Sequence, residues 1–561
     1  MIWQTNSPPN EKVTSKLMTD LGVDKAIASL LVQRGIQTFE DAKTFFRPSL
    51  EQLHDPMLMA DMHKAIDRIT TALNDNEAII VFGDYDVDGT TAVSLMATYL
   101  GNRTDKVTTY IPDRYSEGYG LSLQGIDFAA DNDISLMIVL DCGIKAIDKV
   151  AYAKNKGIDI IICDHHTPGE TIPNAVAVLD PKRKDCSYPF KDLCGCGVGF
   201  KLIQGIEQSE GRPAEGLMPY LDLVAVAIGA DIVSMTDENR VMTHFGLQQI
   251  NTDPRPGLKA IMATFQLNNF SNSDVVFKIA PRINAAGRME QGNFAVDLLM
   301  ARDHKRAKEL AKQIETYNTD RRVLDREITE AALTQIQTNN EVNQFSTVVY
   351  NPNWRKGVIG IVASRLTETH YRPTVVFTKS GDHLAASARS VKGFDLYSTL
   401  EACSDAIVQF GGHKYAAGLT IREDQYDYFK SRFENEVAKR ITEAQRVPTL
   451  RIDLALDFSE ISPKFFRILE QFAPFGPDNM TPVFMSKSVR DTGFGKRVGA
   501  NEDHLKLNLQ QSGQLFPAIG FGLGAKLEQT QNNATFDVAY TVEQNEWHGN
   551  TSLQLKLKDL K

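Results

Sequence analysis

Between residues 76 and 235, short apolar runs alternate with amphipathic stretches. Four of the apolar runs end in acidic or imidazole side chains, and they are 78-AIIVFGDYDVDG-89, 136-LMIVLDCG-143, 158-IDIIICDHH-166 and 222-DLVAVAIGADIV-233. Unbroken runs of this length are typical of strands buried on both faces, and intervening helices indicate βαβ units. The pattern therefore predicts a parallel sheet in which all four segments are strands.

The rest of the chain follows other patterns. Residues up to about 70 are expected to be helical, and a charged stretch with few breakers, roughly 302 to 337, predicts a long connecting helix. A second α/β pattern runs from about 346 to 442, and alternation from 449 to 561 predicts a small antiparallel barrel or sandwich. The expected domains are an N-terminal helical segment (1–70), a parallel-sheet domain (71–300), a connecting helix (301–340), a smaller α/β domain (341–446) and a β-barrel domain (447–561).

Length and composition agree with this division. A chain of 561 residues is too long for one hydrophobic core. Its net charge of -10 argues weakly against a nucleic-acid partner, but the field at a site depends on local charge, and metal-binding carboxylates are neutralised in use. We find no secretory signal and no stretch near the ~20 apolar residues of a membrane helix. Six scattered cysteines fit a reducing compartment, so we expect a soluble, cytoplasmic protein with no membrane association.

The first candidate for chemistry is the segment 82-FGDYDVDG-89. Asp84, Asp86 and Asp88 would repel one another strongly unless a cation lay among them, and oxygen-rich sites of this kind suit Mg²⁺ or Mn²⁺. A calcium loop or a solvated acidic turn is the alternative. An EF-hand needs Glu at the twelfth position, where this chain has Leu95, and a solvated turn does not explain the apolar strand before it. The segment therefore favours a divalent-metal site.

The second candidate is Asp164-His165-His166, at the end of another predicted strand. Vicinal histidines at a strand end cannot face the same way, so one can bind metal while the other meets substrate. Asp141 and Asp231 each end an apolar run, and each alone could equally be a helix cap. Ligands gather at the carboxyl ends of parallel strands, so four converging ends favour a joint site. Two divalent ions roughly 3.5–4 Å apart could clamp a phosphoryl group there.

The residue order DxDxDG, a lone Asp, DHH and a further Asp resembles the DHH phosphoesterase superfamily. The segment 411-GGHKYAAG-418 resembles its companion DHHA1-type substrate-binding domain, and the C-terminal region resembles an OB-fold. Four segments, FGDYDVDG, 281-PRINAAGRM-289, 357-GVIGIVASRL-366 and 472-FAPFGPDNMTPVF-484, resemble more narrowly the RecJ family of bacterial single-strand-specific exodeoxyribonucleases. The resemblance covers residues from about 45 to 550. It implies an α/β fold with a parallel-sheet DHH domain, a smaller DHHA1-type domain joined by the long helix, and an OB-like β-barrel.

The resemblance also implies roles for individual residues. The implied metal ligands are Asp84, Asp86, Asp88, Asp141, His165 and Asp231, with a direct or a supporting role for Asp84 left open. His166 matches the imidazole that faces the phosphate, His413 would approach the scissile phosphate from the second domain, and Arg365 could add to its stabilisation. The implied substrate-binding residues are Arg282, Asn284, Arg288, Arg389, Gly411, Gly412 and Lys414, although Arg282 and Arg288 could also be ordinary surface charges.

Two positions depart from the family pattern. Phe82 stands where many relatives carry His, so one ligand or supporting group is absent, and Ala388 stands where Gly is common. The glycines of 194-CGCGVGFK-201 are not followed by the Gly-Lys-Ser/Thr of a phosphate loop, so they predict a tight turn into a helix.

The implied activity is 5′→3′ hydrolysis of single-stranded DNA to 5′-mononucleotides with two divalent cations, Mn²⁺ or Mg²⁺, in DNA recombination and repair. A monomer is expected, with a helicase and a single-strand-binding protein as candidate partners. Phe475, Phe484 and Trp547 in the C-terminal region could stack on bases, but burial in the core is the more common fate of such aromatics. Two alternatives remain. A phosphodiesterase of short oligonucleotides or cyclic dinucleotides would not need the barrel, and a non-catalytic replication scaffold would not need every acid and both histidines.

Overall fold

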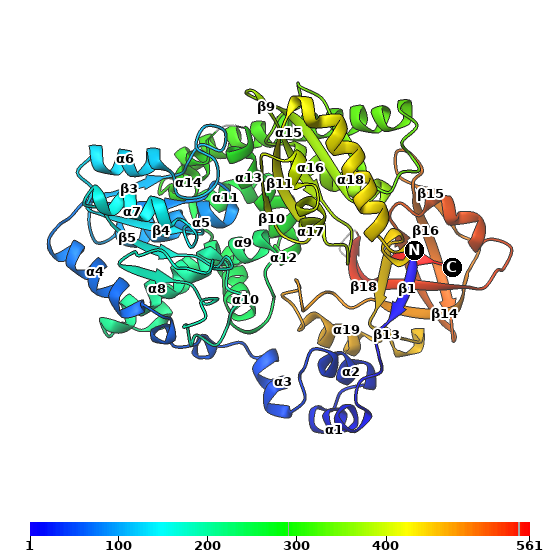
Figure 1. Ribbon diagram of the computed structural model, residues 1–561. Helices are drawn as coiled ribbons and strands as arrows, with labels where there is room; N and C mark the ends of the chain where they lie inside the picture. Colours follow the sequence, from blue (N-terminus) through cyan, green and yellow to red (C-terminus); the bar gives the residue numbers. More distant parts are fainter. Residues whose placement is uncertain (290, 548–549) are drawn as a thin grey trace.

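The computed structural model describes residues 1–289, 291–547 and 550–561, and Figure 1 shows two α/β lobes and a β-rich C-terminal lobe. The first lobe contains a five-stranded sheet in the order β3-β2-β4-β5-β6. Its strands are β2 (Ile79–Gly83), β3 (Val107–Tyr110), β4 (Leu136–Leu140), β5 (Asp159–Cys163) and β6 (Ala177–Leu179). Every neighbouring pair is parallel, so the predicted parallel sheet is confirmed.

Both faces of this sheet are buried. Alternate residues of β2 enter two different cores, with Ile79 and Val81 on one face and Ile80 and Phe82 on the other. The first face is covered by α4 (Met62–Asn74), α5 (Val87–Leu100), α8 (Gly195–Ser209) and α9 (Leu221–Asp231). The second face is covered by α6 (Leu123–Asp131) and α7 (Ile147–Asn155). Burial on both sides explains why the strands read as unbroken apolar runs.

The fourth predicted strand is wrong, because residues 222–233 lie in and just after helix α9. Every residue of α9 from Leu221 to Gly229 is buried, and the helix packs against α5, α8 and α10 (Asp237–Thr252). A helix surrounded by other elements is as uniformly apolar as a strand buried on both faces. Asp231 therefore reaches the site from the end of a helix and not from the sheet.

Further helices lead from the first lobe to the second. They are α11 (Pro256–Met262), α12 (Asn272–Asp274), a π-helical turn (Val275–Ile279), α13 (Ala280–Met289), α14 (Asn293–Met300) and the 35-residue α15 (His304–Thr338). The last of these matches the predicted connecting helix. The second lobe has a sheet in the order β10-β11-β9-β8-β7, in which only β7 and β8 are parallel.

The strands of the second lobe are β7 (Thr347–Tyr350), β8 (Thr374–Ser380), β9 (His383–Arg389), β10 (Gln409–Gly412) and β11 (Ala416–Arg422). Its helices are α16 (Ile359–His370), α17 (Leu396–Glu401) and α18 (Tyr426–Arg440). Figure 1 shows that the sheet stands beside α13 and α15, with β10 and β11 on the side of the first lobe.

The C-terminal lobe is a partly closed barrel in the order β13-β14-β18-β19-β17-β16-β15, in which β14 also pairs with β16. Its strands are β13 (Leu454–Ala455), β14 (Phe484–Asp491), β15 (Lys496–Val498), β16 (His504–Gln511), β17 (Gln514–Gly520), β18 (Phe536–Trp547) and β19 (Asn550–Leu560), and α19 (Pro463–Glu470) precedes β14. The predicted barrel is confirmed, and most of its strand pairs are antiparallel as expected, but β13–β14 and β17–β19 are parallel.

The start of the chain packs on this C-terminal lobe. The expected helices are present as α1 (Glu11–Leu21), α2 (Lys25–Gln33) and α3 (Phe39–Phe46). Before them, β1 (Ile2–Thr5) pairs in parallel with β12 (Thr449–Ile452), which the sequence analysis did not predict. Residues of α1 and α2 share one core with the barrel strands. Among the described residues, no helix combines the length and apolar character needed to cross a bilayer.

Candidate metal centre and nucleic-acid interface

Three acids follow β2 in a turn that leads directly into α5. Asp86 caps the helix, because its Oδ1 accepts a hydrogen bond of 3.0 Å from the backbone N–H of Gly89. A Cβ at Gly89 would lie 2.3 Å from the carbonyl oxygen of Asp84, so only glycine lets the first turn of α5 approach the strand end so closely. The turn keeps Asp84 and Asp88 buried at the carboxyl end of the sheet.

The N-terminus of α8 holds Asp88. The backbone N–H groups of Gly195 and Cys196 donate to its two carboxylate oxygens at 2.6 and 2.7 Å. Free N–H groups at a helix start attract negative charge, which fixes this carboxylate. A Cβ on Gly195 would lie 2.5 Å from Cβ of Asp141, so the approach again requires glycine. The glycines predicted to permit a turn into a helix thus also bring two acids together.

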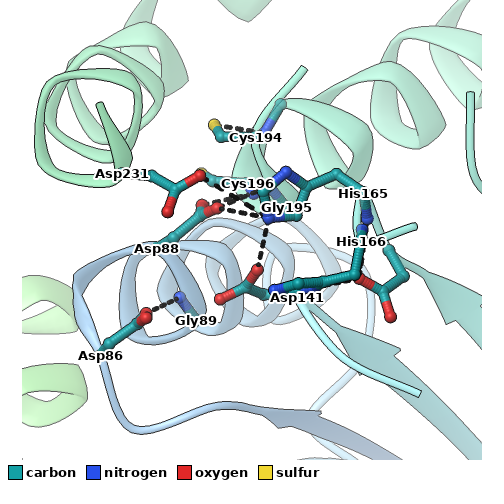
Figure 2. A network of polar contacts seen from close by, with 12 residues as sticks. Asp86, Asp88, Gly89, Asp141, His165, His166, Cys194, Gly195, Cys196 and Asp231 are labelled. Carbon is teal, nitrogen blue, oxygen red and sulfur yellow. Dashed lines mark hydrogen bonds and ion pairs between the residues drawn. The ribbon is translucent and has the colours of Figure 1, made fainter. Parts of the chain in front are cut away.

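His165 is the centre of the acidic cluster. Its Nε2 lies 3.2 Å from Oδ1 of Asp141, 3.6 Å from Oδ2 of Asp231 and 3.8 Å from Oδ2 of Asp88. Figure 2 shows the ring pointing into the space between these carboxylates. Asp141 follows β4 with a φ of 58°, Asp231 ends α9, and His165 follows β5. The site is therefore formed by the ends of β4 and β5, the C-terminus of α9 and the first turn of α5, which carries Asp88.

The electrostatics of the cluster fit a divalent cation. Burial and the charge of neighbouring Asp86 raise the pKa of Asp88 to about 7 and that of Asp84 to about 8. Burial and neighbouring acids raise the pKa of Asp231 to about 8 and place that of Asp141 well above its usual range. Burial lowers the pKa of His165 to about 3, which favours the neutral imidazole that metals bind. A bound cation would offset the repulsion between these carboxylates.

Two groups of potential ligand atoms lie within 4.8 Å of one another: Asp88, His165 and Asp231 in one, and Asp141, His165 and His166 in the other. Carboxylate oxygens with an imidazole suit Mn²⁺ or Mg²⁺. Asp84 and Asp86 belong to neither group. Both carboxylate oxygens of Asp84 and the Nδ1 of His165 are buried without a hydrogen-bond partner among the described residues, and a bound ion with its waters would supply one.

His166 lies at the edge of the acidic cluster, and one of its ring nitrogens is within 4.8 Å of ligand atoms of Asp141 and His165. Its Nδ1 lies 2.7 Å from Oδ1 of Asp164, and its Nε2 lies 3.1 Å from the hydroxyl of Tyr119. Asp164 also accepts backbone hydrogen bonds from Ile144, His165 and His166. Although burial opposes ionisation, these bonds and His166 lower the pKa of Asp164 to about 2. The first acid of the DHH motif therefore orients the two histidines.

A cationic cavity of about 490 Å³ adjoins this cluster. Its cations are Arg114, Arg288, Lys356 and Arg389, and its walls include Tyr85, Tyr119 and residues of β9, β10 and β11. Among the described residues, none that lines it is acidic. Burial and the charges of three other arginines lower the pKa of Arg288 to about 10. The guanidinium of Arg114 lies 3.9 Å from the ring centre of Tyr85, while Arg288 and Arg389 donate to carbonyl and hydroxyl oxygens. The positive charge is thus available to an anion.

Three other residues predicted to act on the substrate lie outside the cavity lining. Arg282 forms an ion pair of 2.5 Å with Glu315 and lies 4.4 Å from the ring centre of Phe265, so its charge is compensated. Arg365 pairs at 2.7 Å with buried Asp325. Asn284 is half-buried on α13.

The glycine-rich segment forms the β10–β11 turn. Gly411 lines the cavity, and Gly412 has a φ of 145°. His413 and Lys414 are exposed in that turn, and neither is among the residues that line the cavity. The roles predicted for these residues stay predictions. Phe82, the departure from the family pattern, is buried on the α6 face and stacks on Tyr110.

A second basic surface lies on the barrel. The strand register places Lys496, Lys506, Ile519 and Lys556 side by side across β15, β16, β17 and β19. Phe521, which is 56% exposed, contacts His504 and lies 5.5 Å from Nζ of Lys556. Lys556 also lies 3.8 Å from Glu543, whereas Lys496 and Lys506 form no ion pair among the described residues. A row of lysines beside an exposed aromatic ring suits a single strand, whose bases stack while its phosphates are neutralised. By contrast, Phe484 is buried in the barrel core and Phe475 is partly buried against it. The side chain of Trp547, the third predicted stacking aromatic, lies outside the described part of the structure.

Sequence reasoning missed Arg114, Tyr119 and Phe521. The first two lie in 114-RYSEGYG-120, where Gly118 and Gly120 have φ values of 86° and 80°. In the sequence, the only indication that this tyrosine has a fixed position is the pair of glycines on either side of it, which permit left-handed backbone conformations. Nothing in the period-two alternation of the barrel distinguishes Phe521 from a core aromatic.

The fold and the site define a metal-dependent phosphoesterase of the DHH type. Family models match residues 78–228 (DHH family, N-terminal domain), 343–439 (DHHA1 domain) and 452–559 (RecJ OB domain). The chain is 35% identical to the single-stranded-DNA-specific exonuclease RecJ of Bacillus subtilis over all of this chain and 70% of that protein. It is 31% identical to the RecJ of Haemophilus influenzae over 90% of this chain and 92% of that protein. The chain belongs to the RecJ family of exonucleases.

A solved structure supports the same conclusion. The crystal structure of RecJ in complex with Mn²⁺ from Thermus thermophilus matches with a TM-score of 0.85 and 26% identity, over all of this chain and 79% of that one. The expected family, the α/β fold with an OB domain, and the metal-dependent exonuclease class are confirmed.

Proposed function

We propose that the chain removes 5′-mononucleotides from single-stranded DNA in the 5′→3′ direction, a reaction that serves DNA recombination and repair. The observation that carries this proposal is the cationic cavity that meets the acidic cluster at Tyr85 and Tyr119. A terminal phosphate carries more negative charge than an internal phosphodiester, so uncompensated arginines favour a strand end over a strand interior. The relatives named single-stranded-DNA-specific exonuclease support the substrate.

The acidic cluster supports metal-dependent hydrolysis. Asp88, Asp141, His165 and Asp231 would hold two divalent cations, Mn²⁺ or Mg²⁺. When bound, the cations would polarise phosphoryl oxygens and lower the pKa of water. The chain's own part is to place the substrate: the arginines of the cavity bind the terminal phosphate, and the barrel face with Phe521 holds the strand behind it. His166 would face the phosphate that is cleaved.

End-labelled DNA tests the proposal. A long single strand labelled at its 5′ end should release the label at once as a mononucleotide with Mn²⁺ or Mg²⁺, whereas a 3′ label should appear late. Early release from the 3′ end would overturn the polarity but not the metal centre. Asp141→Ala should abolish hydrolysis, because Asp141 lies 3.2 Å from His165 at the heart of the cluster. Full activity of that variant would overturn the metal centre.

Two further points belong to the proposal. If dinucleotides or cyclic dinucleotides are cleaved faster than long strands, the short-substrate alternative replaces it, and the basic barrel face argues against that result. A helicase that supplies single strands and a single-strand-binding protein that covers them are proposed partners on the chemistry of the substrate. The same chemistry supports a cytoplasmic location, where bacterial DNA is processed.

A further inference from the structure

Tyr119 lies where the cationic cavity meets the acidic cluster. Its side chain is 53% exposed and lines the cavity together with Arg114 and Arg389. Its hydroxyl lies 3.1 Å from Nε2 of His166 and 3.4 Å from the carbonyl oxygen of Asp141. No role for this residue follows from the metal centre or from the cavity alone.

The segment that carries Tyr119 is fixed by its own hydrogen bonds. Asp113 accepts from the backbone N–H groups of Tyr115 and Ser116, and Glu117 accepts from Ser122, Tyr110 and the N–H of Asp113. The two left-handed glycines on either side of Tyr119 set the direction of the chain. A phenol held in this way keeps its place without substrate, as a positioning group must.

Both ring nitrogens of His166 have a hydrogen-bond partner. Nδ1 lies 2.7 Å from Oδ1 of Asp164, which also accepts from the backbone N–H groups of His165 and His166. Nε2 lies 3.1 Å from the Tyr119 hydroxyl, and that hydroxyl donates to the carbonyl oxygen of Asp141 at 3.4 Å. Asp164, His166 and Tyr119 thus form a chain in which both ring nitrogens are engaged.

We propose that Tyr119 is a positioning residue that acts through His166. It holds the second imidazole of the DHH motif in one rotamer, with Nε2 at the boundary between the acidic cluster and the cavity that receives the phosphate. The inference rests on the proposed nuclease function and deepens it. An imidazole hydrogen-bonded on one side only could rotate about its bonds to the backbone, and a misplaced group at a reaction centre costs roughly 10²-fold in rate.

Tyr119→Phe removes the hydroxyl and keeps the ring. We expect kcat on single-stranded DNA to fall at least about tenfold, within that range of positioning effects, while KM changes little. The matched control is Tyr152→Phe, which loses a comparable phenol bond of 2.7 Å to Asp127 in the same domain and should leave both constants unchanged. A rise in KM with kcat unchanged would mean that Tyr119 only binds substrate, and would overturn the proposal.

Two measurements separate positioning from a structural role. In a His166→Ala background, Tyr119→Phe should have no further effect on rate, whereas multiplied losses would contradict action through His166. The ring nitrogen resonances of His166 in ¹⁵N-histidine protein with Mg²⁺, assigned by their loss in His166→Ala, should shift in Tyr119→Phe and not in Tyr152→Phe. Unchanged resonances would overturn the proposal even if activity is too low to measure. Inactivity of the wild-type protein would instead refute the proposed function.

Discussion

The acids of the cluster differ from ordinary surface carboxylates because burial and their mutual repulsion outweigh the attraction of nearby cations such as Arg114 and Lys182. Asp88 is held by two backbone N–H groups, and Asp84 has no hydrogen-bond partner for its oxygens among the described residues. Each carboxylate therefore depends on a proton or on a metal ion for its remaining stabilisation. Metal binding and protonation must compete at this site.

This competition gives the cluster a definite pH dependence. The pKa values of Asp88, near 7, and of Asp84 and Asp231, near 8, are raised above those of an unfolded chain, about 4. Protonation of these groups therefore stabilises the metal-free fold, fully below about pH 4 and no longer above about pH 8. We expect Mn²⁺ to raise the thermal unfolding midpoint more at about pH 8 than at about pH 6, and to release protons on binding.

Calorimetric titration in two buffers with different ionisation enthalpies measures the released protons. Asp88→Asn removes one titrating group and should release fewer. An Mn²⁺-induced midpoint shift that is equal at both pH values would show that the acids are already ionised in the metal-free protein.

Among the structural elements, α8 has the strongest influence on the site. Its N-terminus contributes no side-chain ligand, yet it fixes Asp88 and packs against Asp141. Gly195→Ala would put a Cβ 2.5 Å from that of Asp141, so either the helix or the acid must move. We expect roughly a 10²-fold loss of kcat/KM and weaker Mn²⁺ binding, because displacements near 1 Å have effects of that size.

Gly216→Ala is the control for this substitution, since a Cβ there meets nothing within 4 Å. Activity and Mn²⁺ affinity, measured by calorimetric titration, should stay at wild-type values in the control. Wild-type activity in Gly195→Ala would mean that the close approach of α8 to Asp141 is not required.

The same elements show what the sequence could and could not predict. The sequence correctly predicted that Asp84, Asp141 and the DHH histidines follow buried strands, because an acid after an unbroken apolar run marks the carboxyl end of a parallel strand. Asp231 was assigned to a strand, since an enclosed helix has the same composition. Tyr119 and Arg114 lie in a polar loop without periodicity, so only the folded chain brings them to His166 and Arg288. The resemblance to a family, and not the pattern, supplied the direction of cleavage.

The three lobes divide the work between chemistry, recognition of the strand end and retention of the strand. The acidic cluster lies in the first lobe, while the cationic cavity is shared by the first and second lobes. The barrel lies beyond these two lobes (Figure 1). The lysines of its basic row belong neither to the acidic cluster nor to the lining of the cavity. Its removal should therefore change how tightly long strands bind and not how fast a bound terminus is cleaved.

Charge removal on the barrel face tests this division. A double substitution, Lys506→Ala with Lys556→Ala, deletes two neighbours of the row while their strands stay paired. If both contact phosphates, the salt dependence of single-strand affinity should fall by about 0.7 for each lost contact. We expect KM for long strands to rise with kcat unchanged, and cleavage of a dinucleotide to be unaffected.

The control is Lys464→Ala on α19, because Lys464 donates a hydrogen bond to the carbonyl oxygen of Gly22 and is not part of this row. An unchanged salt slope in the double variant would show that the strand leaves the active site by another surface, and Phe521→Ala should then also have no effect on affinity.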